Sequence, residues 1–179
     1  MEDSVRAEVE KFLGLKVPEK LLADLNGDEV KYLASKDLED LLLERKPFFL
    51  VDKAVGIGKN CVLGIVNIAT IQCAGHFPGR PIVPLIRMCE ATAQTGVILV
   101  GLNTSHDQAP IAIGAGPSKA LTRTFIEPPV TLLIAVTKIA EKFGALFIVD
   151  GKIFVDEKAV AKLSKIEYFA PHKSKIILS

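Results

Sequence analysis

The sequence predicts an α+β protein in which a curled antiparallel sheet encloses one long helix. The helix is predicted over residues 84–102, where apolar residues recur at helical spacing and Pro84 can occupy the first turn. Runs rich in β-branched and aromatic residues, separated by turn residues, lie on both sides of this segment. A sheet made of so many strands has to curl in order to cover a single apolar helix.

Two strands are expected before the helix, over residues 48–55 and 61–68, and Gly58-Lys59-Asn60 between them favours a hairpin. Three or four more are expected after it, from the candidate segments 111–114, 120–126, 130–141, 145–155 and 159–168. We place the last hairpin turn at Asp156-Glu157. Asp150-Gly151 then becomes a bulge within a long strand.

The first 46 residues are predicted to form a helical N-terminal extension, and residues 47–179 the sheet-and-helix body. Apolar residues recur at helical spacing around Val9 and again around Leu38, where Asp37 is a candidate helix cap. The extension is acidic and only weakly apolar, so we expect it to pack on the body or on a partner chain.

Composition excludes several classes of protein. The apolar stretch near residues 91–102 is shorter than a membrane span and no signal segment opens the chain, so we expect a cytoplasmic protein that does not enter a membrane. The chain has no Trp and only two Tyr, which argues against nucleic-acid binding. Three cysteines at wide spacing suit neither a disulfide framework nor a zinc site. The body carries 14 basic and 9 acidic residues, a balance that favours an acidic partner.

One segment carries residues suited to acid–base chemistry. His76 lies in a loop of sequence GHFPGRP, whose glycines and prolines restrict the backbone, and Glu90 follows fourteen residues later on the predicted helix. Arg87, Glu90 and Gln94 share one polar stripe of that helix. A carboxylate on an apolar helix suits a general acid, and the N–H groups of the helix start could polarise a carbonyl. The pattern alone also allows a plain Arg87–Glu90 salt bridge.

The passage GHFPGRPIVPLIRMCEATAQ, residues 75–94, resembles the signature of the 3-hydroxyacyl-[acyl carrier protein] dehydratases of type II fatty acid synthesis. The segment FFLVD at residues 48–52 and VDEK at 155–158 are similar to further family motifs, so the resemblance spans roughly residues 47–169. It implies a hot-dog fold and a lyase that dehydrates 3-hydroxyacyl thioesters, carried by acyl carrier protein or CoA, to trans-2-enoyl thioesters. No metal or organic cofactor is implied.

The resemblance also implies roles for individual residues. His76 would take the C2 proton, Glu90 would protonate the leaving hydroxyl, the Leu85 backbone N–H would bind the thioester carbonyl, and Gln94 would contact substrate. The active sites would be composite, with His76 and Glu90 supplied by different chains of a homodimer. Family members are often trimers of dimers.

The sequence departs from the family signature at two informative positions. Leu85 replaces a Gly of the family, and its side chain would narrow the mouth of the acyl-chain tunnel that the resemblance implies. Arg87 replaces an apolar residue, and pairing with it would make Glu90 a poorer acid. Two alternatives therefore accompany the dehydratase interpretation. One is a hot-dog protein that binds acyl thioesters or a carrier protein without catalysis, and the other is an acyl thioesterase.

Overall fold

The structure is a computed structural model that describes residues 3–23, 29–42, 45, 47–77, 79–104, 111–115, 117–122, 124–143 and 145–170. Pro78 of the predicted active-site loop lies outside these residues. The described helices are α1 (Asp3–Leu13), α2 (Glu19–Ala23), α3 (Ser35–Leu41) and α4 (Leu85–Asn103), with a short 3₁₀ turn, η1, at Thr70–Cys73.

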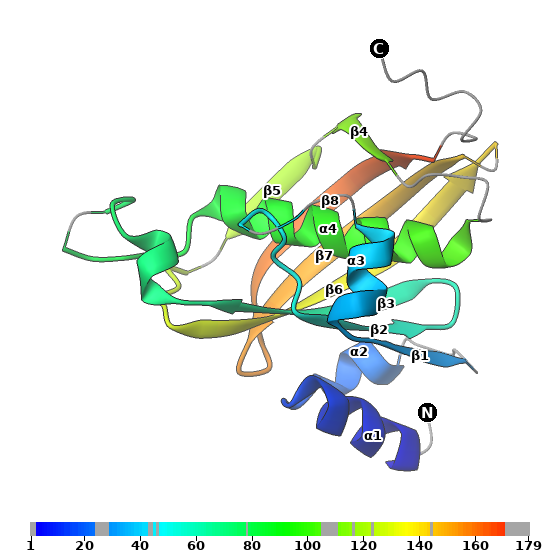
Figure 1. Cartoon of the computed structure of the whole chain (residues 1–179), viewed down its shortest axis with the longest axis horizontal. Coiled ribbons are helices and arrows are strands. Elements are labelled where there is room, and N and C mark those ends of the chain that lie inside the picture. The colour runs from blue at the N-terminus through cyan, green and yellow to red at the C-terminus, as the bar shows by residue number, and fades with distance from the viewer. Residues whose placement is uncertain are drawn as a thin grey trace.

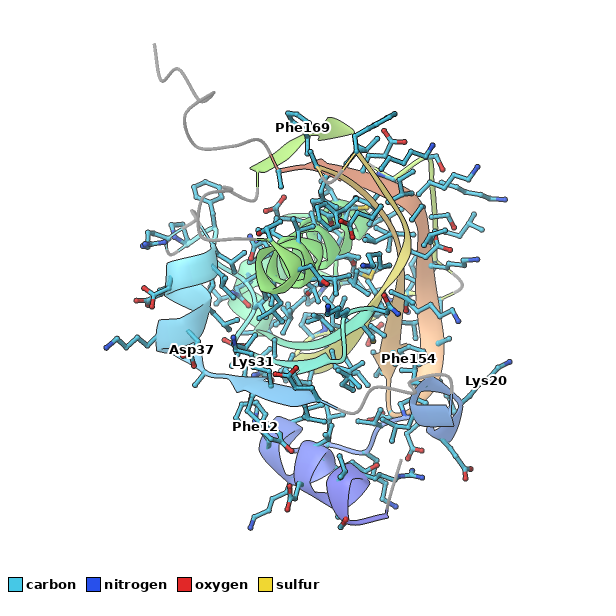
Figure 2. The ribbon with its side chains drawn as sticks, turned by 90° about the vertical axis from the view of Figure 1, so that its right-hand side faces the viewer. Phe12, Lys20, Lys31, Asp37, Phe154 and Phe169 are labelled. Atoms are coloured by element: carbon cyan, nitrogen blue, oxygen red, sulfur yellow. The ribbon has the colours of Figure 1, made fainter. Side chains whose placement is uncertain are left out.

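The described strands form one eight-stranded sheet with antiparallel pairing throughout, in the order β1-β2-β3-β6-β7-β8-β4, and β5 also pairs with β8. Their bounds are β1 Val30–Leu33, β2 Lys53–Ile57, β3 Cys61–Ile68, β4 Ile111–Ala115, β5 Lys119–Thr122, β6 Val130–Lys142, β7 Leu146–Val155 and β8 Lys158–Phe169. The sheet curls around α4 (Figures 1 and 2), as the sequence predicts.

Helix α4 forms the centre of the core. Its residues Met88, Ala91, Ile98, Leu99 and Val100 are almost fully buried against the concave face of the sheet. By length and composition α4 alone among the described helices could cross a membrane, but its enclosure by the sheet identifies it as the core helix of a globular protein. Close approach is made possible by glycine: a Cβ on Gly151 of β7 would lie 2.3 Å from Thr92 Cγ2.

Part of the convex face of the sheet is apolar as well. Alternate residues of β2, β3 and β6 that point away from α4 pack with residues of α1 and α2 in a second, separate cluster. Figure 1 shows α1 and α2 on the side of the sheet opposite α4. The protein therefore has three layers: the N-terminal helices, the sheet and the core helix.

The predicted hairpins are confirmed. β2 and β3 pair across residues 58–60, and β7 and β8 pair across Asp156-Glu157, both of which have positive φ. The predicted irregularity at Asp150 is present, but the extra residue belongs to β8, because one residue of β7 there faces two of β8. Lys165 of β8 takes φ +54° and its N–H donates to Asp150 Oδ1 at 2.9 Å.

Several details of the prediction are wrong. Five described strands follow α4, where three or four were expected. The strand expected over 48–55 begins only at Lys53, and the strand expected over 120–126 ends at Thr122. Helix α3 starts at Ser35 with Ala34 as its N-cap, and Asp37 instead accepts a hydrogen bond from the Ala34 N–H at 2.9 Å. The extension contains the expected short helices and also strand β1, which was not expected.

Candidate active site

The N-terminus of α4 presents unpaired backbone donors. Pro84 is the N-cap residue and provides no side-chain acceptor. The N–H groups of Arg87 and Met88 both donate to Pro84 O, at 3.0 and 3.3 Å. Among the described residues nothing accepts from the N–H groups of Leu85 and Ile86, so these two donors remain open to an external carbonyl. The Leu85 side chain packs against the core cluster, whereas Ile86 is 75% exposed.

The loop that carries His76 follows directly on η1. The His76 N–H donates to Cys73 O at 3.3 Å, and Gly75 and Gly79 have φ of +89° and +79°, which favour glycine at both positions. The imidazole lies edge-on to the Phe77 ring, with centroids 4.6 Å apart. The His76 side chain is exposed to solvent in the single chain.

Two contacts hold the far end of this loop. The Val83 N–H donates to Ile126 O at 2.8 Å, and Arg80 Nε pairs with Glu127 Oε1 at 2.9 Å. The second contact is an exposed ion pair and is therefore weak, about 0–1 kcal/mol. The loop is thus joined to the segment that leads into β6.

Glu90 and Gln94 form the best-defined polar contact of the site. Gln94, only 1% exposed, donates from Nε2 to Glu90 Oε1 at 2.9 Å and to Phe48 O at 2.6 Å. Its Oε1 accepts from the Leu50 N–H at 2.8 Å. Both amide hydrogens of Gln94 are used in this way. Gln94 therefore ties the segment before β2 to α4 and fixes one oxygen of the exposed Glu90 carboxylate.

Arg87 is half-buried, and in the part of the chain that the structure describes it forms no ion pair with Glu90. Its charge acts instead on Cys73 of η1. Burial raises the pKa of the Cys73 thiol, and Arg87 opposes that increase. Among the described residues, the Glu90 carboxylate therefore bonds Gln94 and not Arg87.

Tyr168 is a residue near the site that sequence reasoning missed. Its hydroxyl donates to Ala93 O of α4 at 3.0 Å, and its ring fills the space that a Cβ on Gly96 would need. Burial raises the pKa of Tyr168, and the charge of Glu90 raises it further. A signal was present in the alternation of β8, which places residue 168 on the face toward α4.

The structure brings together only some of the predicted site residues. Glu90, Gln94 and the start of α4 lie on one helix, while His76 and Glu90 share no hydrogen bond within the described residues. The same residues contain no cluster of His, Cys, Asp and Glu that could hold a metal ion. A cavity of about 410 Å³ lies elsewhere, on the convex face beside Leu15, Leu133 and Phe154.

A family model for the FabA-like domain matches residues 42–164. The 3-hydroxyacyl-[acyl-carrier-protein] dehydratase FabZ of Syntrophotalea carbinolica is 32% identical in an alignment over 139 residues that covers 75% of this chain and 93% of that protein. The protein of the same name from Chlamydia trachomatis serovar L2 is 34% identical over 142 residues, covering 75% of this chain and 91% of its own.

Solved structures share the fold at low sequence identity. The dehydratase heterocomplex ApeI:P from Xenorhabdus doucetiae aligns with a TM-score of 0.62 and 15% identity, covering 81% of this chain and 95% of that chain. The thioesterase HI1161 from Haemophilus influenzae also has a TM-score of 0.62, with 10% identity, 80% of this chain and 94% of that chain. The expected hot-dog fold is confirmed.

Proposed function

Because this chain belongs to the FabA-like family, we propose that it is a hydro-lyase that dehydrates 3-hydroxyacyl thioesters to trans-2-enoyl thioesters. The observation that carries the proposal is the hydrogen bond from Gln94 to Glu90, which orients the Glu90 carboxylate on α4. The first N–H groups of the same helix are open to a substrate carbonyl. The FabZ relatives, named as dehydratases acting on acyl carrier protein substrates, support this substrate class.

The proposed reaction needs one base, one acid and one oxyanion donor. His76 takes the C2 proton, and the electrons of that C–H bond form the C2=C3 double bond as the C3–O bond breaks. Glu90 gives a proton to the departing hydroxyl, which leaves as water. The Leu85 N–H binds the thioester carbonyl, where negative charge develops as the C2 proton is removed. No electrons enter or leave, so no redox cofactor is required.

We propose that the site is completed by a second copy of the chain, with His76 of one protomer facing Glu90 of the other. Two features of the single chain support this. Both catalytic side chains are exposed, and apolar side chains near them are exposed too: Ile71, Phe77, Ile86 and Phe125. In addition, β4 and β5 pair only with β8 among the described strands, which leaves an edge at which a second sheet can continue.

The carrier of the acyl group is proposed to be acyl carrier protein, or CoA. The excess of basic residues in the body, 14 against 9 acidic, suits an acidic carrier protein. We further propose a cytoplasmic location, because the described thiols of Cys61, Cys73 and Cys89 are free, as is usual in a reducing compartment.

Hydration of trans-2-enoyl thioesters, the reverse reaction, tests the proposal. The wild-type chain should consume the enoyl absorbance, and His76→Ala and Glu90→Gln should each lower kcat by about 10²–10⁴-fold. Glu167→Gln, which alters an exposed carboxylate of β8 that has no part in the proposed site, is the matched control and should retain most of the activity. Saturable binding without turnover would favour the binding protein, and release of free thiol would favour the thioesterase.

Co-expression of two inactive variants tests the composite site separately. A heterodimer of His76→Ala and Glu90→Gln contains one site with both residues intact and one with neither. Random pairing should therefore restore about one quarter of wild-type activity, since half of the dimers are mixed and each has one working site. Activity that stays at the level of the single variants would show that His76 and Glu90 act within one chain.

A further inference from the structure

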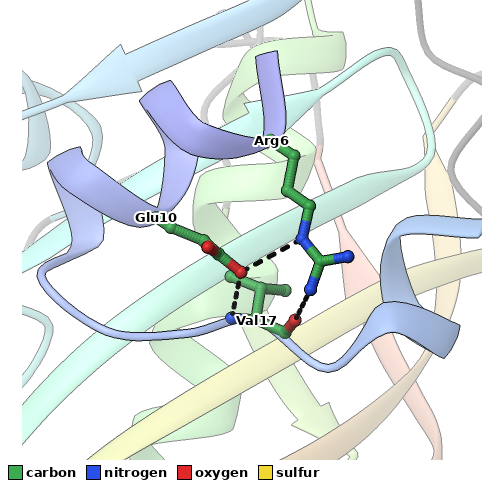
Figure 3. Close-up of polar contacts among 3 residues, drawn as sticks. All are labelled: Arg6, Glu10 and Val17. Atoms are coloured by element: carbon green, nitrogen blue, oxygen red, sulfur yellow. Dashed lines mark hydrogen bonds and ion pairs between the residues drawn. The ribbon is translucent and has the colours of Figure 1, made fainter. Parts of the chain in front are cut away.

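Arg87, on the first turn of α4, has a guanidinium without a hydrogen-bond or ion-pair partner among the described residues. Arg6 of α1 is half-buried like Arg87, but it donates to Glu10 Oε1 at 3.3 Å and to Val17 O at 3.4 Å (Figure 3). Each of the other arginines that the structure describes donates to an acceptor: Arg6, Arg45 and Arg80. A guanidinium is always charged and carries five N–H donors, so a half-buried one favours an external anion.

Arg87 lies close to the proposed active site. It follows Leu85 by two residues on α4 and precedes Glu90 by three, which places it on the same side of the helix as Glu90. Burial raises the pKa of the Cys73 thiol, and the charge of Arg87 opposes that increase, so this charge also acts on the turn that leads to His76. An anion bound by Arg87 would therefore lie beside the reacting part of the acyl group.

The described acidic residues of the site already have other partners. Glu90 accepts from Gln94 at 2.9 Å and is proposed to transfer a proton, and Glu127 pairs with Arg80. Three apolar side chains of the helix start and of the neighbouring segment are exposed: Ile71, Phe77 and Ile86. When a bound substrate excludes water from such a surface, the attraction between a cation and an anion is stronger than in water. The site thus favours a substrate that brings its own negative charge.

We propose that Arg87 binds a carboxylate carried by the acyl group, so that the substrate is a 3-hydroxyacyl thioester with a second acidic group. The inference rests on the proposed function, because it names the substrate class of the same site. The planar guanidinium can donate two parallel hydrogen bonds to a carboxylate.

The phosphate of a pantetheine arm offers the same chemistry to a guanidinium. That phosphate is at the end of the arm farthest from the thioester, whereas the acyl group begins at the thioester carbonyl. Leu85, whose N–H is proposed to bind this carbonyl, is only two residues from Arg87. The short separation favours the acyl group as the source of the anion.

Hydration of two matched enoyl thioesters tests the proposal. The charged probe is a trans-glutaconyl thioester, whose acyl chain ends in a carboxylate, and the neutral probe is its methyl ester. Both are N-acetylcysteamine thioesters, which contain no phosphate. Arg87→Leu removes the charge, and Arg87→Lys keeps the charge without the two parallel donors. Arg6→Leu, on the opposite side of the sheet from α4, is the matched control.

The wild type and Arg6→Leu should have a kcat/KM for the charged probe roughly 10–100-fold above that for the neutral probe, the range expected for hydrogen bonds between charged groups. Arg87→Leu should lose this preference through a higher KM for the charged probe, and its kcat/KM for the neutral probe should stay close to the wild-type value. Arg87→Lys should be intermediate. Equal kcat/KM for the two probes in the wild type would overturn the inference and leave the proposed function intact.

CoA thioesters of the same two acyl groups distinguish the sources of negative charge. A loss in Arg87→Leu that is confined to the CoA thioesters and equal for both acyl groups would assign Arg87 to a phosphate, and would overturn the proposal. Light scattering after gel filtration checks a third arrangement. A smaller mass for Arg87→Leu than for the wild type would show that Arg87 pairs with the partner subunit, which would also overturn it.

Binding of unreactive analogues tests the role of Arg87 without turnover. The analogues are the saturated glutaryl thioester and its methyl ester, and calorimetry gives their affinities. Tighter binding of the charged analogue, lost in Arg87→Leu and kept in Arg6→Leu, would support the inference even if the wild type hydrated no enoyl thioester. Equal affinities of the wild type for the two analogues would contradict it.

Discussion

The amide of Gln94 donates to the carboxylate of Glu90 at 2.9 Å, and it does so from a buried position one turn farther along α4. The same amide bonds two backbone groups of the segment before β2, Phe48 O and the Leu50 N–H. Gln94 is therefore placed to orient the Glu90 carboxylate by a direct hydrogen bond. Direct contact between Gln94 and substrate stays a prediction.

Replacement of Gln94 by Leu should reduce both stability and turnover. The backbone groups of Phe48 and Leu50 would lose their partner, which costs about 1–3 kcal/mol in the free energy of unfolding, and Glu90 would lose its orienting donor. Urea melts and enoyl hydration measure the two effects, and kcat should fall more than KM rises. Asn103→Ala removes another α4 amide, bonded to Leu99 O at the far end of the helix, and should leave kcat unchanged.

The contact between Gly151 and Thr92 should behave as a coupled pair. Gly151→Ala would bring a Cβ to 2.3 Å from Thr92 Cγ2, and we expect a loss of about 1–3 kcal/mol. Thr92→Ser removes that methyl group but keeps the hydroxyl that bonds Met88 O. The double variant should recover most of the loss in a thermodynamic cycle of chemical melts. Additive losses would show that the clash is relieved by movement elsewhere.

Stability should decrease at alkaline pH because of Cys61. Burial raises the pKa of this thiol from 9.0 to about 12, with a hydrogen bond from Thr137 acting in the opposite direction. Below pH 9.0 the thiol is protonated in both the folded and the unfolded states, so the contribution of Cys61 to the free energy of unfolding is fully present. Above that pH only the unfolded state ionises, and stability is lost by up to about 1.4 kcal/mol per pH unit until the folded thiol also titrates.

Urea melts at about pH 8 and about pH 10.5 check this prediction. Between these two pH values the free energy of unfolding should fall more for the wild type than for Cys61→Ala, because the variant has no thiol to ionise at this position. Equal losses in the two proteins would show that other groups determine the alkaline limit.

The turn at Asp156-Glu157 should gain stability from glycine. Both residues have positive φ, 47° and 65°, a conformation that disfavours residues with a side chain. Glu157→Gly should raise the free energy of unfolding by roughly 0.5–1 kcal/mol, as measured by thermal or urea melts. Lys158→Gly, one residue later in the extended start of β8, should lower it instead.

Patterns among residues close in sequence were sufficient to predict several elements of this fold. The helix from Leu85, the turn at Asp156-Glu157 and the irregularity at Asp150 follow from spacing and turn residues close in sequence. The strand predicted from Phe48 failed for a tertiary reason. The backbone of Phe48 and Leu50 bonds the Gln94 side chain, 46 and 44 residues away, in place of a neighbouring strand.

The site shows the same division. His76 and Glu90 are predicted from residue type, loop composition and helical spacing, all of which are local, and their catalytic roles stay a prediction. Tyr168 was missed because its role depends on Gly96, a residue with no side chain on an element distant in sequence. The exposed ion pair between Arg80 and Glu127 joins residues that are 47 positions apart, and no periodic pattern in the sequence predicts it.

The N-terminal helices and the convex strand residues should change together during evolution. A relative that lost α1 and α2 would expose Leu63, Ile65 and Leu133 to water, so polar residues would be favoured at those positions, whereas Val62 and Ile134 on the opposite face would be free of that pressure. The polarity of a few alternate strand positions then predicts, from sequence alone, whether a given family member carries such an extension.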